Sequence, residues 1–352
     1  MTGVSVIIPC HQAAATLPRC LRAIRREAQR CPSIREVIVV DDASTDGSHQ
    51  LAECLGARLL RLPVNRGCCA ARNAGAALAG ESILWFLDAD VEVRPGAADR
   101  LVRFFETNPG HAAVIGSYDD DPAAPGTVSQ FKNLFHHYVH QQAPGPDVAS
   151  FWTGCGAVRR TVFEQLGGFD DSFWPRATIT DIDFGYRLGA AGHRIGILKD
   201  LQVRHLKAWR LGALIRTDML QRALPWTILL FRHRGAGRGQ LNLARGYRVS
   251  IVLVGLSAGL FGAGWLWHPA WAGALAALLG ALAPHRRLLG WLARRRGARF
   301  LPGAVLLLWL YFLYCGLGGA AGLAVVLGRR VGLGPRSRLA KSDPCRTMET
   351  PR

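Results

Sequence analysis

Acidic residues are scarce in the second half of this sequence. Residues 184–352 contain 4 Asp and Glu against 26 Lys and Arg, a net charge of +22, whereas residues 1–183 contain 21 acidic against 17 basic residues, a net charge of −4. The stretches 249–267 and 302–328 lack charged residues altogether. About 20 such apolar residues span a bilayer. This pattern excludes a second half that folds entirely in water, and we expect it to be embedded in a membrane.

The nine cysteines show none of the spacings of a zinc site, and no secretory signal precedes Val4. We therefore expect a reduced, cytosolic catalytic half. Cys68 and Cys69 are adjacent in the sequence. Because adjacent cysteines rarely form a disulfide, they predict small buried thiols and not a redox pair.

Short apolar runs alternate with helical patterns along the first 120 residues. The runs at 4–9, 36–40 and 83–87 are rich in Val, Ile and Leu and predict buried strands, whereas 16–29 and 68–79 have helical spacing. The alternation predicts a doubly wound parallel sheet of the α/β class. Ligands of such sheets bind beyond the carboxyl ends of the strands.

Acidic pairs stand at two of those strand ends. Asp41 and Asp42 follow the second predicted strand, and Asp88 and Asp90 follow the run ILWFL. Two carboxylates one residue apart can hold a hard divalent cation, Mg²⁺ or Mn²⁺, which suits a diphosphate. The alternative is a helix cap, but capping would use only one of the two acids. The segment 119–146, rich in Pro, Asp, His and Gln, predicts a long mobile loop over this edge.

Six motifs follow one another between about residues 4 and 210: VSVIIPC, VIVVDDASTDGS, NRGCCAARNAG, FLDAD, GCGAVRRTVFEQLGGFDD and TDIDFGYRL. In this order they resemble the motifs of the inverting family 2 glycosyltransferases. The resemblance implies a GT-A fold, a Rossmann-like doubly wound sheet, in a catalytic domain that uses a nucleotide-sugar donor and Mg²⁺ or Mn²⁺.

The resemblance also implies roles for matching positions. Asp42 would accept a hydrogen bond from the donor base, and Arg72 would offset diphosphate charge. The metal would be held by Asp90, with Asp88 nearby and His205 as a third ligand or a diphosphate contact. The positions that match the donor nucleotide site are Pro9, Asp42, Asn65, Gly67, Arg72 and Asp88.

Inverting transfer needs a general base that takes the proton of the acceptor hydroxyl. The resemblance assigns this role to Asp181 in TITDIDFGYRL; the alternative is that Asp181 only caps a helix. Thr180 stands where the family usually has Glu, which bears on acceptor contacts more than on the base. Gly154 and Asp183 are the further candidates for contacts with the sugar or the acceptor.

The second half predicts membrane segments of several kinds. Residues 1–208 would form the catalytic domain and 209–245, with Arg at intervals and two Trp, interfacial amphipathic helices. Residues 246–330 would hold transmembrane helices, including a tight helical hairpin that breaks at His268–Pro269. The basic segment 331–352 would be a disordered tail.

We therefore expect a glycosyltransferase of the hexosyltransferase type. It would be a multi-pass protein of the inner membrane whose catalytic domain lies in the cytoplasm and serves a lipid or lipid-linked acceptor. One alternative is a processive polysaccharide synthase, although QRALPW (221–226) lacks the Gln-x-x-Arg-Trp spacing of those enzymes. Another is a membrane-tethered nucleic-acid-binding or scaffold protein. The basic residues flank apolar stretches instead of clustering with exposed aromatics, so we expect no nucleic acid partner.

Overall fold

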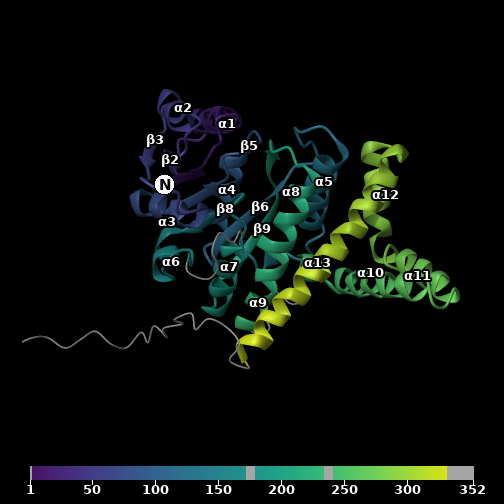
Figure 1. The fold of residues 1–352 in the computed structure, drawn as a ribbon. Helices are drawn as coiled ribbons and strands as arrows, with labels where there is room; N and C mark the ends of the chain where they lie inside the picture. The colour runs from purple at the N-terminus through teal and green to yellow at the C-terminus, as the bar shows by residue number, and fades with distance from the viewer. Residues whose placement is uncertain (1, 172–178, 234–240, 331–352) are drawn as a thin grey trace, which may run out of the picture.

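The computed structural model describes residues 2–171, 179–233 and 241–330, and a nine-stranded mixed sheet organises the first two thirds of the chain (Figure 1). Six strands run parallel to one another, and β5, β7 and β8 run antiparallel to their partners. The order across the sheet is β3 (Arg58–Arg61), β2 (Ile34–Asp41), β1 (Val4–Cys10), β4 (Ile83–Leu87), β8 (Cys155–Arg159), β6 (His111–Tyr118), β9 (Arg194–His205) and β5 (Val91–Val93), with β7 (Asp147–Val148) paired to β9.

The prediction of a parallel sheet is wrong for β5. A parallel neighbour needs a crossover of a dozen residues or more. Only Asp88 to Asp90 separate β4 from β5, so β5 joins the far edge of the sheet and pairs antiparallel with β9.

Helices cover both faces of the sheet because its central strands are apolar on both sides. In β1, Val4, Val6 and Ile8 face one core and Ile7 faces the other. The first core contains α1 (Leu17–Arg30), α2 (Ser48–Cys54) and α4 (Ala97–Thr107), and the second contains α3 (Cys68–Leu78), α6 (Arg160–Gln165) and α7 (Thr180–Ala190).

The predicted loop over 119–146 is wrong, because most of this segment is the helix α5 (Thr127–Gln141). Phe131, Leu134 and Phe135 of α5 are buried in a third core that includes α12 (Arg286–Arg296) and α13 (Leu301–Arg330). The polar composition of the segment hid an apolar face that the C-terminal helices cover.

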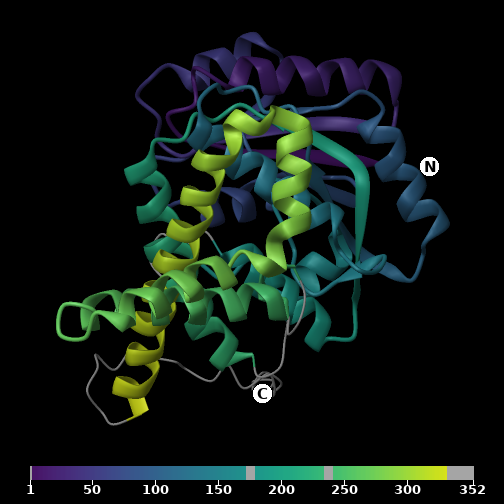
Figure 2. The ribbon, with the colours of Figure 1, turned by 90° about the vertical axis from the view of Figure 1, so that its right-hand side faces the viewer.

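Residues 211–232 form a continuous helical stretch of α8 (Leu211–Arg216), a π-helix η1 (Thr217–Ala223) and α9 (Leu224–Arg232), which packs on α13. The expected hairpin is present: α10 (Arg245–Ala263) packs on α11 (Pro269–Gly280) and projects away from the sheet (Figures 1 and 2). Short 3₁₀ turns at Leu241–Leu243, Ala283–His285 and Ala298–Phe300 connect these helices.

Within residues 2–171, 179–233 and 241–330, two helices are long and apolar enough to cross a membrane, Arg245–Ala263 and Ala298–Arg329. The sequence predicts a multi-pass membrane protein, and the described part of the chain contains two candidate membrane spans. The helix α11 has 12 residues and α12 is rich in Arg. The predicted disordered tail, 331–352, lies outside the described residues.

Candidate active site

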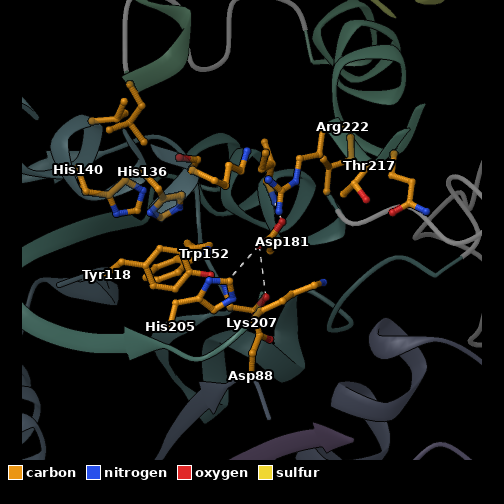
Figure 3. Close-up of a pocket in the computed structure, with 18 of the residues that line it drawn as sticks. Asp88, Tyr118, His136, His140, Trp152, Asp181, His205, Lys207, Thr217 and Arg222 are labelled. Atoms are coloured by element: carbon orange, nitrogen blue, oxygen red, sulfur yellow. Dashed lines mark hydrogen bonds between the residues drawn. The ribbon is translucent and has the colours of Figure 1, made fainter. Parts of the chain in front are cut away.

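A cavity of about 370 Å³ opens at the carboxyl ends of the sheet strands. Asp88 and Asp90 line it from the sheet side, and Asp181 lines it from the first turn of α7. Residues of α5, η1, α9 and α13 complete its wall. Figure 3 shows Asp181 at the centre of this cavity, with Asp88 on one side and Arg222 on the other. The cavity therefore joins the acidic edge of the sheet to the apolar C-terminal half.

Asp88 is paired with Arg72 of α3. The Arg72 Nη2 atom lies 2.6 Å from Oδ1 of Asp88, and Arg72 is 6% exposed. Burial lowers the pKa of Arg72, but nearby anionic groups, Asp88 among them, outweigh burial and raise it. The Arg72 Nε atom is buried without a hydrogen-bond partner, so the guanidinium retains a donor for a further acceptor.

Asp90 faces His205, which ends β9. The distance from His205 Nε2 to Asp90 Oδ2 is 3.5 Å, and His205 Nδ1 lies 2.6 Å from the Asn133 side-chain oxygen. If Nδ1–H donates to that oxygen, the neutral ring presents the Nε2 lone pair to the cavity. Burial raises the pKa of Asp90, but when the ring is instead protonated, the hydrogen bond from Nε2–H and the charge of His205 outweigh burial and lower that pKa.

These side chains fit a divalent cation that a ligand helps to hold. Asp88 and Asp90 supply oxygen ligands and His205 a nitrogen on one cavity wall. Across residues 2–171, 179–233 and 241–330, no group of three or more His, Cys, Asp or Glu could hold a metal ion by itself. A cation here would need oxygen atoms from a bound diphosphate.

The predicted base-binding residues lie at the ends of β1 and β2. Asp42 is 2% exposed, and its two oxygens accept hydrogen bonds from the backbone N–H groups of Arg66 and Gly67, each at 2.7 Å. Through these hydrogen bonds Asp42 fixes the position of the segment that carries Gly67. Asn65 is exposed, and Pro9 is buried and pairs with Val40 of β2. None of these four predicted residues, Pro9, Asp42, Asn65 and Gly67, lines the cavity of Asp181.

Asp181 is buried, at 7% exposed, and faces the cavity. Its Oδ2 accepts hydrogen bonds from the backbone N–H and hydroxyl of Thr153, both at 3.3 Å. Burial raises the pKa of Asp181; the charge of Arg72 and hydrogen bonds to Thr153 and Ile182 counteract this only in part. A buried carboxylate with a raised pKa has the property that a general base near neutral pH requires.

The two remaining predicted residues do not reach the cavity. Asp183 is fully buried and accepts hydrogen bonds from Arg187 Nε at 2.8 Å and from His233 Nε2 at 2.9 Å. These two partners hold the Asp183 carboxylate within the packing of α7. Asp183 therefore does not face the cavity in which an acceptor would bind. At Gly154, a Cβ atom would lie 2.4 Å from Cζ2 of the Trp152 ring. Gly154 makes room for Trp152, and that ring lines the cavity.

Residues 5–167 match the family described as Glycosyl transferase family 2. This stretch of the chain belongs to the family. A search of curated proteins finds 27% identity over 224 residues to validoxylamine A glucosyltransferase of Streptomyces hygroscopicus subsp. jinggangensis, covering 54% of this chain and 52% of that protein. A second relative is the N-acetylglucosaminyl-diphospho-decaprenol L-rhamnosyltransferase of Mycobacterium tuberculosis, 27% identical over 248 residues, with 60% and 79% covered.

Among solved structures, the chain is similar to a mannosyltransferase of Pyrobaculum calidifontis in complex with GDP-Man and Mn²⁺. The TM-score is 0.56 at 19% identity, over 90% of this chain and 86% of that one. This likeness establishes the GT-A fold. The chain spans about half of the validoxylamine A glucosyltransferase, 52% of its length.

Sequence reasoning missed several residues of this cavity. Tyr118 stacks on His205 with ring centroids 4.5 Å apart and meets Trp152 edge-on at 4.9 Å. His136 and His140 of α5 complete this aromatic wall (Figure 3), and burial lowers the pKa of both, that of His140 to about 4. Their clustering depends on α5, which the sequence did not predict. Arg222 directly follows Gln221 in QRALPW (221–226), the segment compared with the Gln-x-x-Arg-Trp motif, and this position was a signal for a residue of the cavity.

Proposed function

We propose that this chain transfers a sugar from a nucleotide-sugar donor to a lipid or lipid-linked acceptor, with inversion, at a membrane surface. The observation that carries the proposal is the position of Asp181. It lies in one cavity between the strand-end carboxylates Asp88 and Asp90 and the helices of the apolar half. A base in this place can serve an acceptor that arrives from the membrane side.

The sheet side would bind the donor. Arg72 has an unpartnered Nε and can contact the diphosphate when its pairing with Asp88 loosens. Asp42 would shape the base pocket through the segment at Gly67, which it fastens with two hydrogen bonds. Asp90, with Asp88 and His205, would hold Mg²⁺ or Mn²⁺, which would neutralise charge on the departing diphosphate.

Asp181 would act as the general base. As the acceptor oxygen bonds to the anomeric carbon, the bond from that carbon to the diphosphate oxygen breaks and the diphosphate leaves with the electron pair. The acceptor proton passes to a carboxylate oxygen of Asp181. Thr153 holds that carboxylate through two hydrogen bonds, which orients it before the acceptor binds.

The acceptor side is built for an amphiphile. Trp226 of α9 and Tyr311 of α13 line the cavity, and α13 continues as a candidate membrane span. Large apolar side chains are exposed along α10, α11 and α13, including Leu256, Leu275 and Leu317. Such a surface is typical of a membrane contact. The relative named for a decaprenol-linked diphospho-sugar supports a lipid-linked acceptor for this chain.

The location follows from this arrangement. We place residues 1–208 in the cytoplasm as the catalytic domain, 209–245 at the membrane surface, and 246–330 in and on the inner membrane. Nucleotide sugars are made in the cytosol, so the cavity must open there. The Arg-rich helix α12 fits the same side.

The test is transfer by membranes that contain the full chain. Membranes would be incubated with a panel of nucleotide sugars and a lipid extract, and mass spectrometry would look for nucleoside diphosphate and a new glycolipid. Membranes with Asp181→Asn are the matched control for an acceptor that reacts through a hydroxyl, because donor binding should then persist while transfer slows strongly. Release of nucleoside diphosphate without a glycolipid, from every donor and lipid fraction, would contradict a lipid acceptor.

A further inference from the structure

We infer that the end of the cavity opposite the strand-end acids binds a phosphate group of the acceptor, held by Arg222 and Lys132. The inference rests on the proposed function and deepens it, because it names the chemical class of the acceptor headgroup. It concerns a part of the cavity that lies outside the six motifs found between residues 4 and 210.

Two cations share one carboxylate at this end of the cavity. Lys132 Nζ of α5 lies 2.6 Å from Oδ2 of Asp218, and Arg222 Nη1 lies 3.0 Å from Oδ1 of the same residue. Tyr314 of α13 donates a hydrogen bond of 3.0 Å to Oδ2. The Asp218 side chain is only 3% exposed, so the carboxylate that joins the two cations is held in the interior of the protein.

The cluster leaves a positive charge facing the cavity. One carboxylate cannot neutralise two cations, and both Lys132 and Arg222 line the cavity while Asp218 does not. Lys207 lies beside His205 and Asp88 on the sheet side of the cavity (Figure 3), where its charge acts on Asp90, so it does not belong to this cluster. Holding surplus charge in a partly buried site is costly unless an anion binds there.

Two of the other three carboxylates of the cavity have partners on the sheet side. Asp88 pairs with Arg72, and Asp90 faces His205. Asp181 accepts hydrogen bonds from Thr153 and Ile182, and its charge also acts on Arg222. Figure 3 shows Arg222 directed toward Asp181. An anion at Arg222 would therefore lie next to the base, where the acceptor reacts.

The local backbone fits a recognition site. Asp218 and Arg222 are four residues apart in the π-helix η1, and short π-helical segments occur frequently at functional sites. The planar guanidinium of arginine suits two oxygens of a phosphate, and lysine adds a point charge. Trp226 and Tyr311 beside them offer apolar surface to the chain that carries the phosphate.

A binding experiment tests the site directly. Full-length protein in detergent would be titrated with decyl phosphate or with decanol, and Trp fluorescence or calorimetry would report binding. We expect decyl phosphate to bind more tightly than decanol, and Arg222→Gln to weaken decyl phosphate binding roughly tenfold or more. The matched control is Arg216→Gln, an exposed arginine on α8 that does not line the cavity.

Two further measurements separate recognition from structure. Arg222→Lys keeps the charge, so it should bind decyl phosphate better than Arg222→Gln, and nucleoside diphosphate affinity should be unchanged in both variants. Equal loss in both variants would assign Arg222 a packing role and overturn the inference. Wild-type affinity for decyl phosphate in Arg222→Gln, or a parallel loss of nucleoside diphosphate binding, would also overturn it.

The phosphate has two chemical sources, which turnover distinguishes. In a lipid monophosphate the phosphate oxygen is itself the nucleophile and is already ionised, so Asp181→Asn should slow transfer little. In a lipid diphosphate that carries a sugar, a hydroxyl reacts and Asp181→Asn should slow transfer about 100-fold. Either result supports the phosphate site. If the wild type transfers sugar but Arg222→Gln binds decyl phosphate as well as the wild type does, the phosphate site is wrong and the proposed function stands. If decyl phosphate binding depends on Arg222 but no sugar is transferred to any acceptor, the proposed function is wrong and the phosphate site stands.

Discussion

Asp181 is subject to opposing electrostatic effects that suit a base and would not suit a merely structural carboxylate. Burial favours its protonated form, whereas Arg72 and the hydrogen bonds to Thr153 and Ile182 favour the charged form, and the net effect raises its pKa. The neighbouring Asp183 has a lowered pKa because His233 and Arg187 outweigh its burial. Two aspartates separated by one residue are therefore prepared for different tasks: Asp183 stays charged and holds α7, and Asp181 can take up a proton.

Asp181→Asn keeps the size of the side chain but removes the basic carboxylate. With a hydroxyl acceptor we expect kcat to fall about 10²-fold or more while donor affinity stays near that of the wild type. The wild-type rate should fall as the pH drops through the raised pKa of Asp181, above the range of an ordinary aspartate, and the variant should lack this acidic limb. Steady-state kinetics against pH measure both effects. The exposed Asp200→Asn is the control, and near wild-type turnover in Asp181→Asn would place the base elsewhere.

Asp90→Ala should weaken donor binding because it removes an oxygen ligand of the shared cation. In the wild type, a chelator should abolish donor binding and Mn²⁺ should restore it, whereas Mn²⁺ should have little effect on the variant. Calorimetric titration with the nucleoside diphosphate measures this without turnover. Unchanged affinity in chelator, or in the variant, would contradict a metal at Asp90.

At the scale of single elements, α7 sets the position of the base through close backbone contact. Gly185 lies one turn after Asp181, and a Cβ atom added there would lie 2.3 Å from the backbone nitrogen of Phe151. Phe151 and Trp152 belong to the segment that lines the cavity before β8. The absence of a side chain thus keeps α7 and the cavity wall at their observed separation.

Gly185→Ala should push α7 away from this segment. We expect a loss of about 1–3 kcal/mol in the free energy of unfolding, the usual cost of overpacking, together with a lower kcat. Gly189→Ala is the matched control on the same helix, because a Cβ atom there meets no atom within 4 Å. Chemical denaturation in detergent and kinetics would measure the two variants. Equal stability of both would show that the contact at Gly185 does not fix α7.

The sequence predicted those strands and helices whose own residues show the apolar pattern of a buried element. Buried β-branched runs revealed β1, β2 and β4, and their ends located Asp42, Asp88 and Asp90 on one edge. The helix α5 was missed because its apolar face, with Leu134, gains meaning only against α13. The cation cluster was missed for the same reason: Lys132 of α5 is far in the sequence from Asp218 and Arg222 of η1, and each alone resembles an ordinary surface charge.

At the scale of the whole molecule, the fold places a catalytic sheet against an apolar base. The helix α13 packs on α5, η1 and α9, so one helix connects the cavity to the surface that we propose contacts lipid. Figures 1 and 2 show the α10–α11 hairpin reaching away from this junction. With 12 residues, α11 is about 18 Å long, shorter than the roughly 30 Å of a bilayer core.

The hairpin should therefore enter the membrane and return to the side it came from. Its tip carries Trp265, Leu266 and Trp267, which are 74%, 95% and 64% exposed and have little reason to be apolar in water. Arginines stand at both of its bases, Arg245 and Arg248 in the first turn of α10 and Arg286 at the start of α12, which is expected if both bases lie on the cytoplasmic side.

Replacing Trp265, Leu266 and Trp267 together by Ser should release a larger share of the protein from membranes in a carbonate wash, because apolar area at the tip no longer favours insertion. Val64→Ser, which alters an apolar residue of the catalytic half that is 60% exposed, should not. In Leu266→Cys, a membrane-impermeant maleimide added from the outer side should give no labelling beyond the wild-type background. Labelling of that cysteine from the outer side would mean that α10 crosses the bilayer, and the protein would then expose the tip of the hairpin on the far face.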